Sequence, residues 1–130
     1  SFGAYEVFRT NKKINLTILA SGSEVNLAIE TSHKLAKDKI YSKVISVPCH
    51  NIFDKQSSSY KQKILGETKF KISIEAASTD CWKKYTGTDG LTFGIETFGK
   101  SAPYKEIYKY FGLTVENISK TTKNLIKNKK

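Results

Sequence analysis

Hydrophobic and polar positions change period several times along this chain, and each change predicts a new strand or helix. Residues 16–20 (Leu-Thr-Ile-Leu-Ala) and 44–47 are short, mostly apolar runs, typical of strands buried on both faces of a sheet. Residues 70–76 alternate and predict a third strand, and weaker strand patterns occupy residues 4–8 and 91–95. The sequence therefore predicts a sheet of about five strands.

Helical periodicity fills the segments between these strands. Apolar residues from Val25 to Ala36 recur on one face of a helix that opens at the turn Ser21–Glu24, where Ser21 and Glu24 have the spacing of a capping box. Residues 49–58 show no period and are expected to form a loop. Further helices are expected over residues 59–65, for one turn at 80–85, from 101 to 111, and after Thr114, which can cap the last one. Strands alternating with helices predict an α/β sandwich, a mostly parallel sheet with helices on both faces.

Length and composition are those of one globular domain. The chain has 130 residues, 38% of them hydrophobic, with a basic tail from about residue 120 and no linker that would divide it. No apolar run reaches the length of a transmembrane helix, and residues 1–15 lack the apolar core of a signal peptide, so we expect a cytoplasmic protein without a membrane partner. Cys49 and Cys81 lie far apart, which argues against a disulfide framework or a cysteine-rich zinc site.

The formal charge of +10 raises the question of a polyanionic partner. Of the 22 basic residues, 21 are lysines and only Arg9 is an arginine, whereas base recognition and bidentate phosphate binding favour arginine. The lysines are spread over the whole chain and gather only in the tail. This pattern favours a solvated lysine surface over a nucleic-acid site, with a true polyanion site as the remaining alternative.

The turn after the first buried strand is the place where dinucleotide-binding domains hold a pyrophosphate. It has one glycine, Gly22, instead of the three that such a site needs, so no NAD site is expected. A simpler anion site made by Ser21, Gly22 and Ser23 at the helix N-terminus stays open beside the structural interpretation, a capped helix.

No combination of residues suggests acid–base or nucleophilic catalysis. Cys49 and His50 are adjacent, and neighbours on an extended chain point in opposite directions, so they do not form a thiol–imidazole pair. Glu75 ends a strand and needs a partner, either a backbone N–H or a lysine. Trp82 and Tyr85 are expected to pack in the core. We therefore assign no catalytic, cofactor-binding or metal-binding residue.

An ordered series of short motifs closely resembles the C-terminal domain of transketolase over residues 3 to about 126. The matching stretches are Leu-Ala-Ser-Gly-Ser-Glu-Val at 19–25, Val-Pro-Cys at 47–49, Phe-Asp-Lys-Gln at 53–56, Ile-Glu-Ala at 74–76, Trp-Lys-Lys-Tyr-Thr-Gly at 82–87, Phe-Gly-Lys-Ser-Ala-Pro at 98–103 and Phe-Gly-Leu-Thr at 111–114. The resemblance implies a three-layer α/β fold whose five-stranded, mostly parallel sheet has an antiparallel first strand.

The resemblance also implies a function for the whole enzyme. Transketolases transfer a two-carbon ketol unit between sugar phosphates in the pentose phosphate pathway, with thiamine diphosphate and a divalent metal (Mg²⁺ or Ca²⁺) bound by other domains of a homodimer. Thr88-Asp89-Gly90 is not the metal motif of those domains, because no Asn-Asn pair follows it at the needed distance. This chain is then expected to be a non-catalytic domain whose partners are the catalytic domains.

Two loop segments are predicted to contact those catalytic domains. They contain Asp54 and Gln56 in one segment and Phe98 and Ser101 in the other. If Asp54 and Gln56 serve only this contact, replacing them should leave the melting of the isolated domain nearly unchanged. The alternative function is a small regulatory or anion-binding module that uses the helix N-terminus at Ser21–Glu24.

Overall fold

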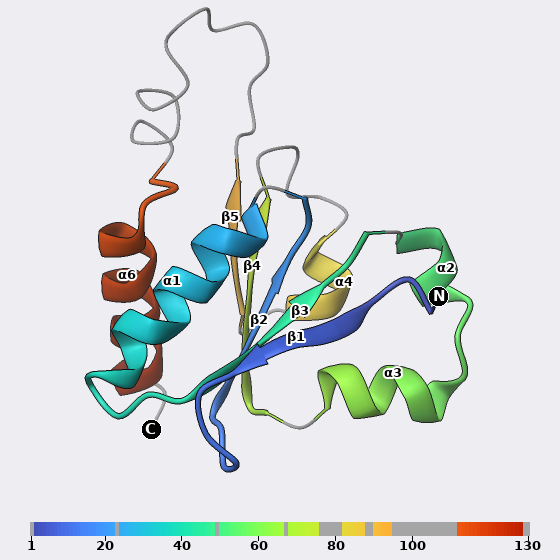
Figure 1. Ribbon diagram of the computed structural model, residues 1–130, viewed down its shortest axis with the longest axis horizontal. Helices are drawn as coiled ribbons and strands as arrows, with labels where there is room; N and C mark the ends of the chain where they lie inside the picture. The colour runs from blue at the N-terminus through green and yellow to red at the C-terminus, as the bar shows by residue number, and fades with distance from the viewer. Residues whose placement is uncertain are drawn as a thin grey trace, which may run out of the picture.

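The sheet is mixed and has the strand order β1-β3-β2-β4-β5. A computed structural model describes residues 2–22, 24–48, 50–66, 68–75, 82–87, 90–94 and 112–128. The strands are β1 (Tyr5–Arg9), β2 (Leu16–Ala20), β3 (Ser42–Ser46), β4 (Phe70–Glu75) and β5 (Leu91–Gly94). β1 pairs with β3 in the antiparallel direction and all other pairs are parallel (Figure 1). The predicted α/β fold with an antiparallel first strand is confirmed.

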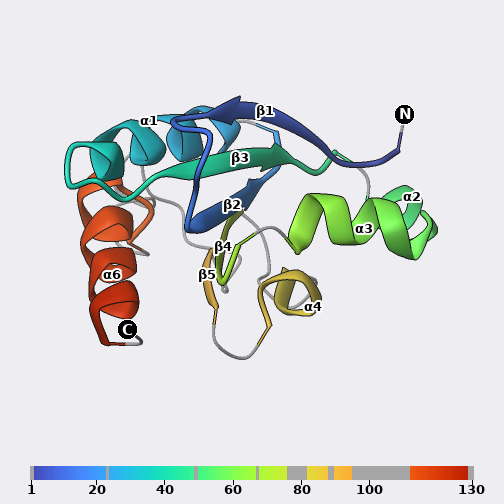
Figure 2. The same ribbon diagram turned by 90° about the horizontal axis from the view of Figure 1, so that it is seen from below.

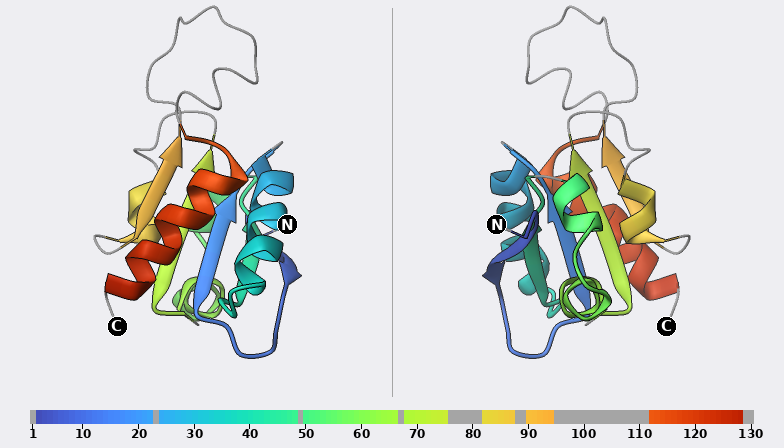
Figure 3. Two further views of the ribbon diagram at one scale, coloured as in Figure 1. Left: turned by 90° about the vertical axis from the view of Figure 1, so that its left-hand side faces the viewer. Right: turned by 90° about the vertical axis from the view of Figure 1, so that its right-hand side faces the viewer.

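Helices cover both faces of this sheet and make three layers (Figures 2 and 3). α1 (Glu24–Ala36) and α6 (Val115–Asn128) lie side by side on one face. The other face carries α2 (His50–Asp54), α3 (Ser58–Leu65) and α4 (Lys83–Thr86). The two groups of helices therefore border different parts of the molecular surface.

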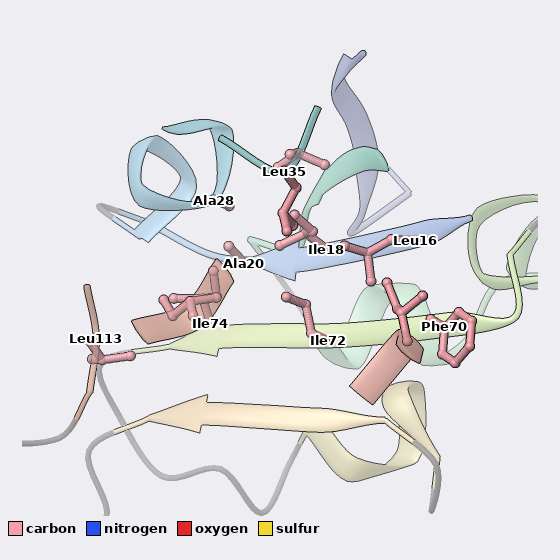
Figure 4. Packing of buried hydrophobic residues seen from close by; sticks show 12 residues of the cluster. Leu16, Ile18, Ala20, Ala28, Leu35, Phe70, Ile72, Ile74 and Leu113 are labelled. Carbon is pink, nitrogen blue, oxygen red and sulfur yellow. The ribbon is translucent and has the colours of Figure 1, made fainter. Parts of the chain in front are cut away.

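The central strand β2 explains the continuous apolar run in the sequence. Its five residues are all buried, because successive side chains point into opposite cores. Ile18 belongs to the core under α1 and α6, together with residues such as Ala28, Leu35 and Ile118 (Figure 4). Leu19 belongs to the core on the other face, together with Phe53, Trp82 and Tyr85.

One predicted helix cap is confirmed, and the structure adds a second that was not predicted. The Thr114 side-chain oxygen accepts a hydrogen bond from the Asn117 N–H at 3.2 Å, which confirms the predicted cap of α6. α3 begins one residue earlier than predicted, at Ser58, and the hydroxyl of Ser57 accepts from the Tyr60 N–H. The helix predicted over residues 101–111 lies outside the described residues.

The prediction of an unbroken loop over residues 49–58 is wrong, because α2 lies within it. Phe53 on α2 is fully buried, with its ring centroid 5.4 Å from that of Tyr85 and 6.3 Å from that of Tyr60. One buried residue holds this short helix in place, and one residue gives no periodicity for sequence analysis to detect.

Candidate functional site

The turn between β2 and α1 has a different arrangement from the predicted capping box. α1 begins at Glu24, so Ser21 lies outside its first turn, and Ser23 is outside the described residues. The Ser21 hydroxyl donates a hydrogen bond to a carboxylate oxygen of Glu75 at the end of β4. Because β2 and β4 are parallel neighbours, their carboxyl ends meet there. Glu75 thus has a serine hydroxyl as a partner, where the sequence suggested a backbone N–H or a lysine.

This hydrogen bond bears directly on the anion site considered for Ser21, Gly22 and Ser23. The Ser21 hydroxyl already donates to a carboxylate, and Glu24, with only 4% of its surface exposed, adds a second acidic side chain at the same turn. Two carboxyl groups at one turn oppose the approach of a phosphate. Thiamine diphosphate and NAD therefore do not fit this turn, and the alternative function as an anion-binding module there gains no support.

His50 lies in an aromatic cluster on the other face of the sheet. Its ring is stacked on Tyr85 with centroids 5.3 Å apart, and meets Trp82 edge-on at 4.5 Å. Burial lowers the pKa of His50, the nearby Lys84 ammonium lowers it further, and Asp54 opposes both effects. The neutral imidazole is favoured, and the ring serves packing; Trp82 and Tyr85, both buried, pack as predicted. The neighbouring Cys49 lies outside the described residues.

Asp54 joins α2 to α4. Its Oδ2 lies 2.6 Å from the Lys84 Nζ, and its Oδ1 accepts a hydrogen bond of 2.8 Å from the Tyr85 hydroxyl. Burial alone would raise the pKa of this carboxyl, but the hydrogen bonds from Lys84 and Tyr85 outweigh burial, so the pKa is lowered. The Asp54 side chain therefore belongs to the scaffold of the domain itself.

The other residues predicted to contact the catalytic domains divide in two groups. The Gln56 side-chain amide donates to the Ile52 backbone oxygen at 2.9 Å, a bond within the same segment. Phe98 and Ser101 lie outside the described residues. Sequence reasoning did not single out Lys84 as the partner of Asp54, and no local signal could have done so, because 30 residues separate the two.

The sequence analysis also did not predict an exposed apolar surface. We call it the N-terminal apolar surface. It consists of Phe2, Tyr5, Val7 and Ile52, which expose 56%, 51%, 38% and 42% of their surface. Phe2 stacks on Tyr60 of α3 with ring centroids 4.7 Å apart, and β1 is an edge strand of the sheet. The start of the chain lies near α2 in both views (Figures 1 and 2).

The described residues contain neither a metal-binding cluster of side chains nor a helix that could cross a membrane. Within them, no group of three or more His, Cys, Asp or Glu side chains could hold a metal ion. The helices of that part of the chain are too short or too polar to cross a membrane.

Comparisons with known proteins agree with the fold. The family model described as "Transketolase-like TK C-terminal domain" matches residues 3–114. A transketolase of Buchnera aphidicola subsp. Schizaphis graminum is 41% identical over 129 residues, which are 98% of this chain and 19% of the relative. A transketolase structure from Leishmania mexicana superimposes with a TM-score of 0.86 at 37% identity, over 98% of this chain and 18% of that one.

A more distant structure shares the fold alone. It is described as a split gene transketolase, an inactive beta4 tetramer, and matches with a TM-score of 0.67 at 16% identity, over 89% of this chain and 40% of that one. The chain thus spans about a fifth of the length of the Buchnera and Leishmania transketolases, and 98% of it aligns with each of them. It belongs to the family of transketolase C-terminal domains.

Proposed function

We propose that this chain is the non-catalytic domain of a cytoplasmic transketolase and supports the assembly of the catalytic domains into a homodimer. The complete enzyme would transfer a two-carbon ketol unit between sugar phosphates in the pentose phosphate pathway. Thiamine diphosphate and a divalent metal would be bound by the catalytic domains. His50 packs against Trp82 and Tyr85, and Asp54 is engaged by Lys84 and Tyr85, so we assign neither side chain a role in that chemistry.

The N-terminal apolar surface carries this proposal. In a C-terminal domain the rest of the enzyme precedes the first residue, so the preceding domain would reach the molecule beside Phe2. Full burial of a large apolar side chain contributes about 1.5–3 kcal/mol. Tyr5, which is 51% exposed, would gain about half of that on docking, and the four side chains together would contribute several kcal/mol. That amount is enough to hold two domains of one polypeptide together.

The test uses the complete product of the reading frame that encodes this chain. Tyr5→Thr and Val7→Thr remove apolar surface but keep residues suited to a strand. We expect both to lower the dimer stability or the melting temperature of the complete enzyme, while the 130-residue chain melts as before. Asn26→Ala, at an exposed position on α1, is the matched control and should change neither.

Two results would overturn the proposal. One is ketol transfer by the 130-residue chain itself, measured with thiamine diphosphate, magnesium and a pair of pentose phosphates. The other is a complete enzyme whose assembly is unaffected by both threonine substitutions.

A further inference from the structure

The seam between α1 and α6 is hollowed and lined with lysines. Two hollows of about 370 and 360 Å³ are bordered by α6 together with α1 or the turn after it, and a third of about 440 Å³ adjoins them along α1 alone; Asp38 borders all three. The two helices lie side by side on the same face of the sheet (Figure 3, left). We call this feature the α1–α6 groove; its lysines are Lys34, Lys37, Lys39, Lys120, Lys123 and Lys127.

The charge in the α1–α6 groove is unbalanced. Among the described residues that border the hollows, six lysines face three acidic residues, Glu30, Asp38 and Glu116, which leaves a local charge of 6 − 3 = +3. One ion pair forms among them, between the Lys123 Nζ and an Asp38 carboxylate oxygen at 3.1 Å. Within the described part of the chain, the other five lysines form no ion pair. An anion in the groove would therefore meet several ammonium groups without displacing existing partners.

Lys39 borders the 370 Å³ hollow at the point where α1 ends and the Ile40 N–H donates to the Leu35 oxygen at 3.1 Å. Its φ of 62° lies in the left-handed region that favours glycine. A glycine would adopt this conformation without strain, so Lys39→Gly removes one ammonium group from the groove and leaves the backbone as it is.

We propose that the α1–α6 groove binds a small anion that carries two or more linked phosphate groups. Lysine binds phosphate as a compact point charge, and hollows of 300–1,000 Å³ are typical of small-molecule sites. Linked phosphates would span the lysines of both helices, whereas a single phosphate would reach only some of them. This site is distinct from the turn at Ser21 and does not depend on the proposed role in assembly.

A nucleic acid fits the groove less well. The one arginine of the chain, Arg9, lies on β1 and engages Glu6 at 2.8 Å. Among the described residues that border the three hollows there is no Phe, Tyr or Trp on which a base could stack. The observations therefore favour a small phosphorylated ligand.

The test measures binding of inorganic tripolyphosphate to the 130-residue chain by calorimetry at 0.15 M salt. We expect saturable binding with one site, and binding of orthophosphate at least about tenfold weaker, since one phosphate meets fewer ammonium groups. Lys39→Gly and Lys127→Gln should each weaken tripolyphosphate binding about five- to tenfold. Lys55→Gln, at an exposed position after α2, is the matched control and should bind like the parent.

Lys39→Gly separates ligand binding from folding, because this variant should melt at or above the temperature of the parent while it binds more weakly. Three results would overturn the proposal: no saturable binding, equal weakening by Lys55→Gln, or tighter binding of a DNA duplex that Lys39→Gly and Lys127→Gln abolish. The first would mean that the lysines are only solvated, the second that the attraction is diffuse, and the third that the groove is a nucleic-acid site.

Discussion

Replacing Asp54 with alanine should destabilise the isolated domain, contrary to the expectation from the sequence. The change removes the carboxylate that accepts a hydrogen bond from the hydroxyl of Tyr85, a residue that is only 6% exposed. It also removes the ion-pair partner of Lys84. A hydrogen bond to a charged group contributes about 1.5–3 kcal/mol, and an exposed ion pair about 0–1 kcal/mol. The Asp54 side chain is 36% exposed, so the lower part of these ranges applies and the expected total is about 2 kcal/mol. For a domain of this size, thermal melting should fall by about 6–10 °C.

Three variants divide this loss between the two partners of Asp54. Asp54→Asn keeps an oxygen for the Tyr85 hydroxyl, so it should be less destabilising than Asp54→Ala. Lys84→Ala breaks the exposed ion pair and the contact of the Lys84 ammonium with the Tyr85 ring, and should cost about 0.5–2 kcal/mol. Tyr85→Phe combined with Asp54→Ala should cost less than the sum of the two single changes, because both remove the same hydrogen bond.

Thermal and urea denaturation of the 130-residue chain measure these effects. If Asp54→Ala melts like the parent while the complete enzyme loses dimer stability, Asp54 serves the contact between domains and the reasoning from its hydrogen bonds is refuted.

The pH dependence of stability gives a second check on the role of Asp54. The folded-state pKa of Asp54 is lowered, so its contribution is present above the unfolded value of about 4 and is lost as the pH falls through the folded value. The parent should therefore lose more stability than Asp54→Ala on acidification below about pH 4.

Three further predictions follow from single contacts. The pKa of His50 is lowered, so the stability that its neutral ring contributes is complete above the unfolded value of about 6.5 and declines as the pH falls toward the folded value. His50→Phe should therefore make the melting temperature less dependent on pH in this window, and an unchanged profile would contradict the burial of the ring. Thr114→Ala should cost about 0.5–2 kcal/mol in urea unfolding through loss of the α6 cap, whereas Thr114→Ser should retain most of the stability. Ser21→Ala should cost about 1–3 kcal/mol, because it leaves Glu75 without its hydroxyl donor, and should add little once Glu75 is replaced by alanine, which has no acceptor; additive losses would mean that the hydrogen bond does not couple them.

The strands and long helices could be predicted because their physical cause is local in the sequence. β2 shows as a continuous apolar run since both of its faces are covered, and α1 shows as a 3.6-residue period since one face is covered. α2 could not be predicted, because a single buried residue, Phe53, fixes it. The bonds of Asp54 and of Ser21 join residues 31 and 54 positions apart, so they depend on the tertiary fold and leave no pattern in any short window.

The positions of the lysines also depend on contacts between residues far apart in the sequence, and these contacts bear on the function. In the sequence, Lys34 and Lys37 look like ordinary complements to the dipole at the end of a helix, and the lysines after residue 120 look like a solvated basic tail. The packing of α6 on α1 brings these two groups together, and the ion pair between Asp38 and Lys123 closes a separation of 85 residues. The fold therefore brings six of the 21 lysines together at one groove. Net charge and its spacing along a sequence can exclude an arginine-rich site, but whether lysines form a binding surface is decided by which helices pack together.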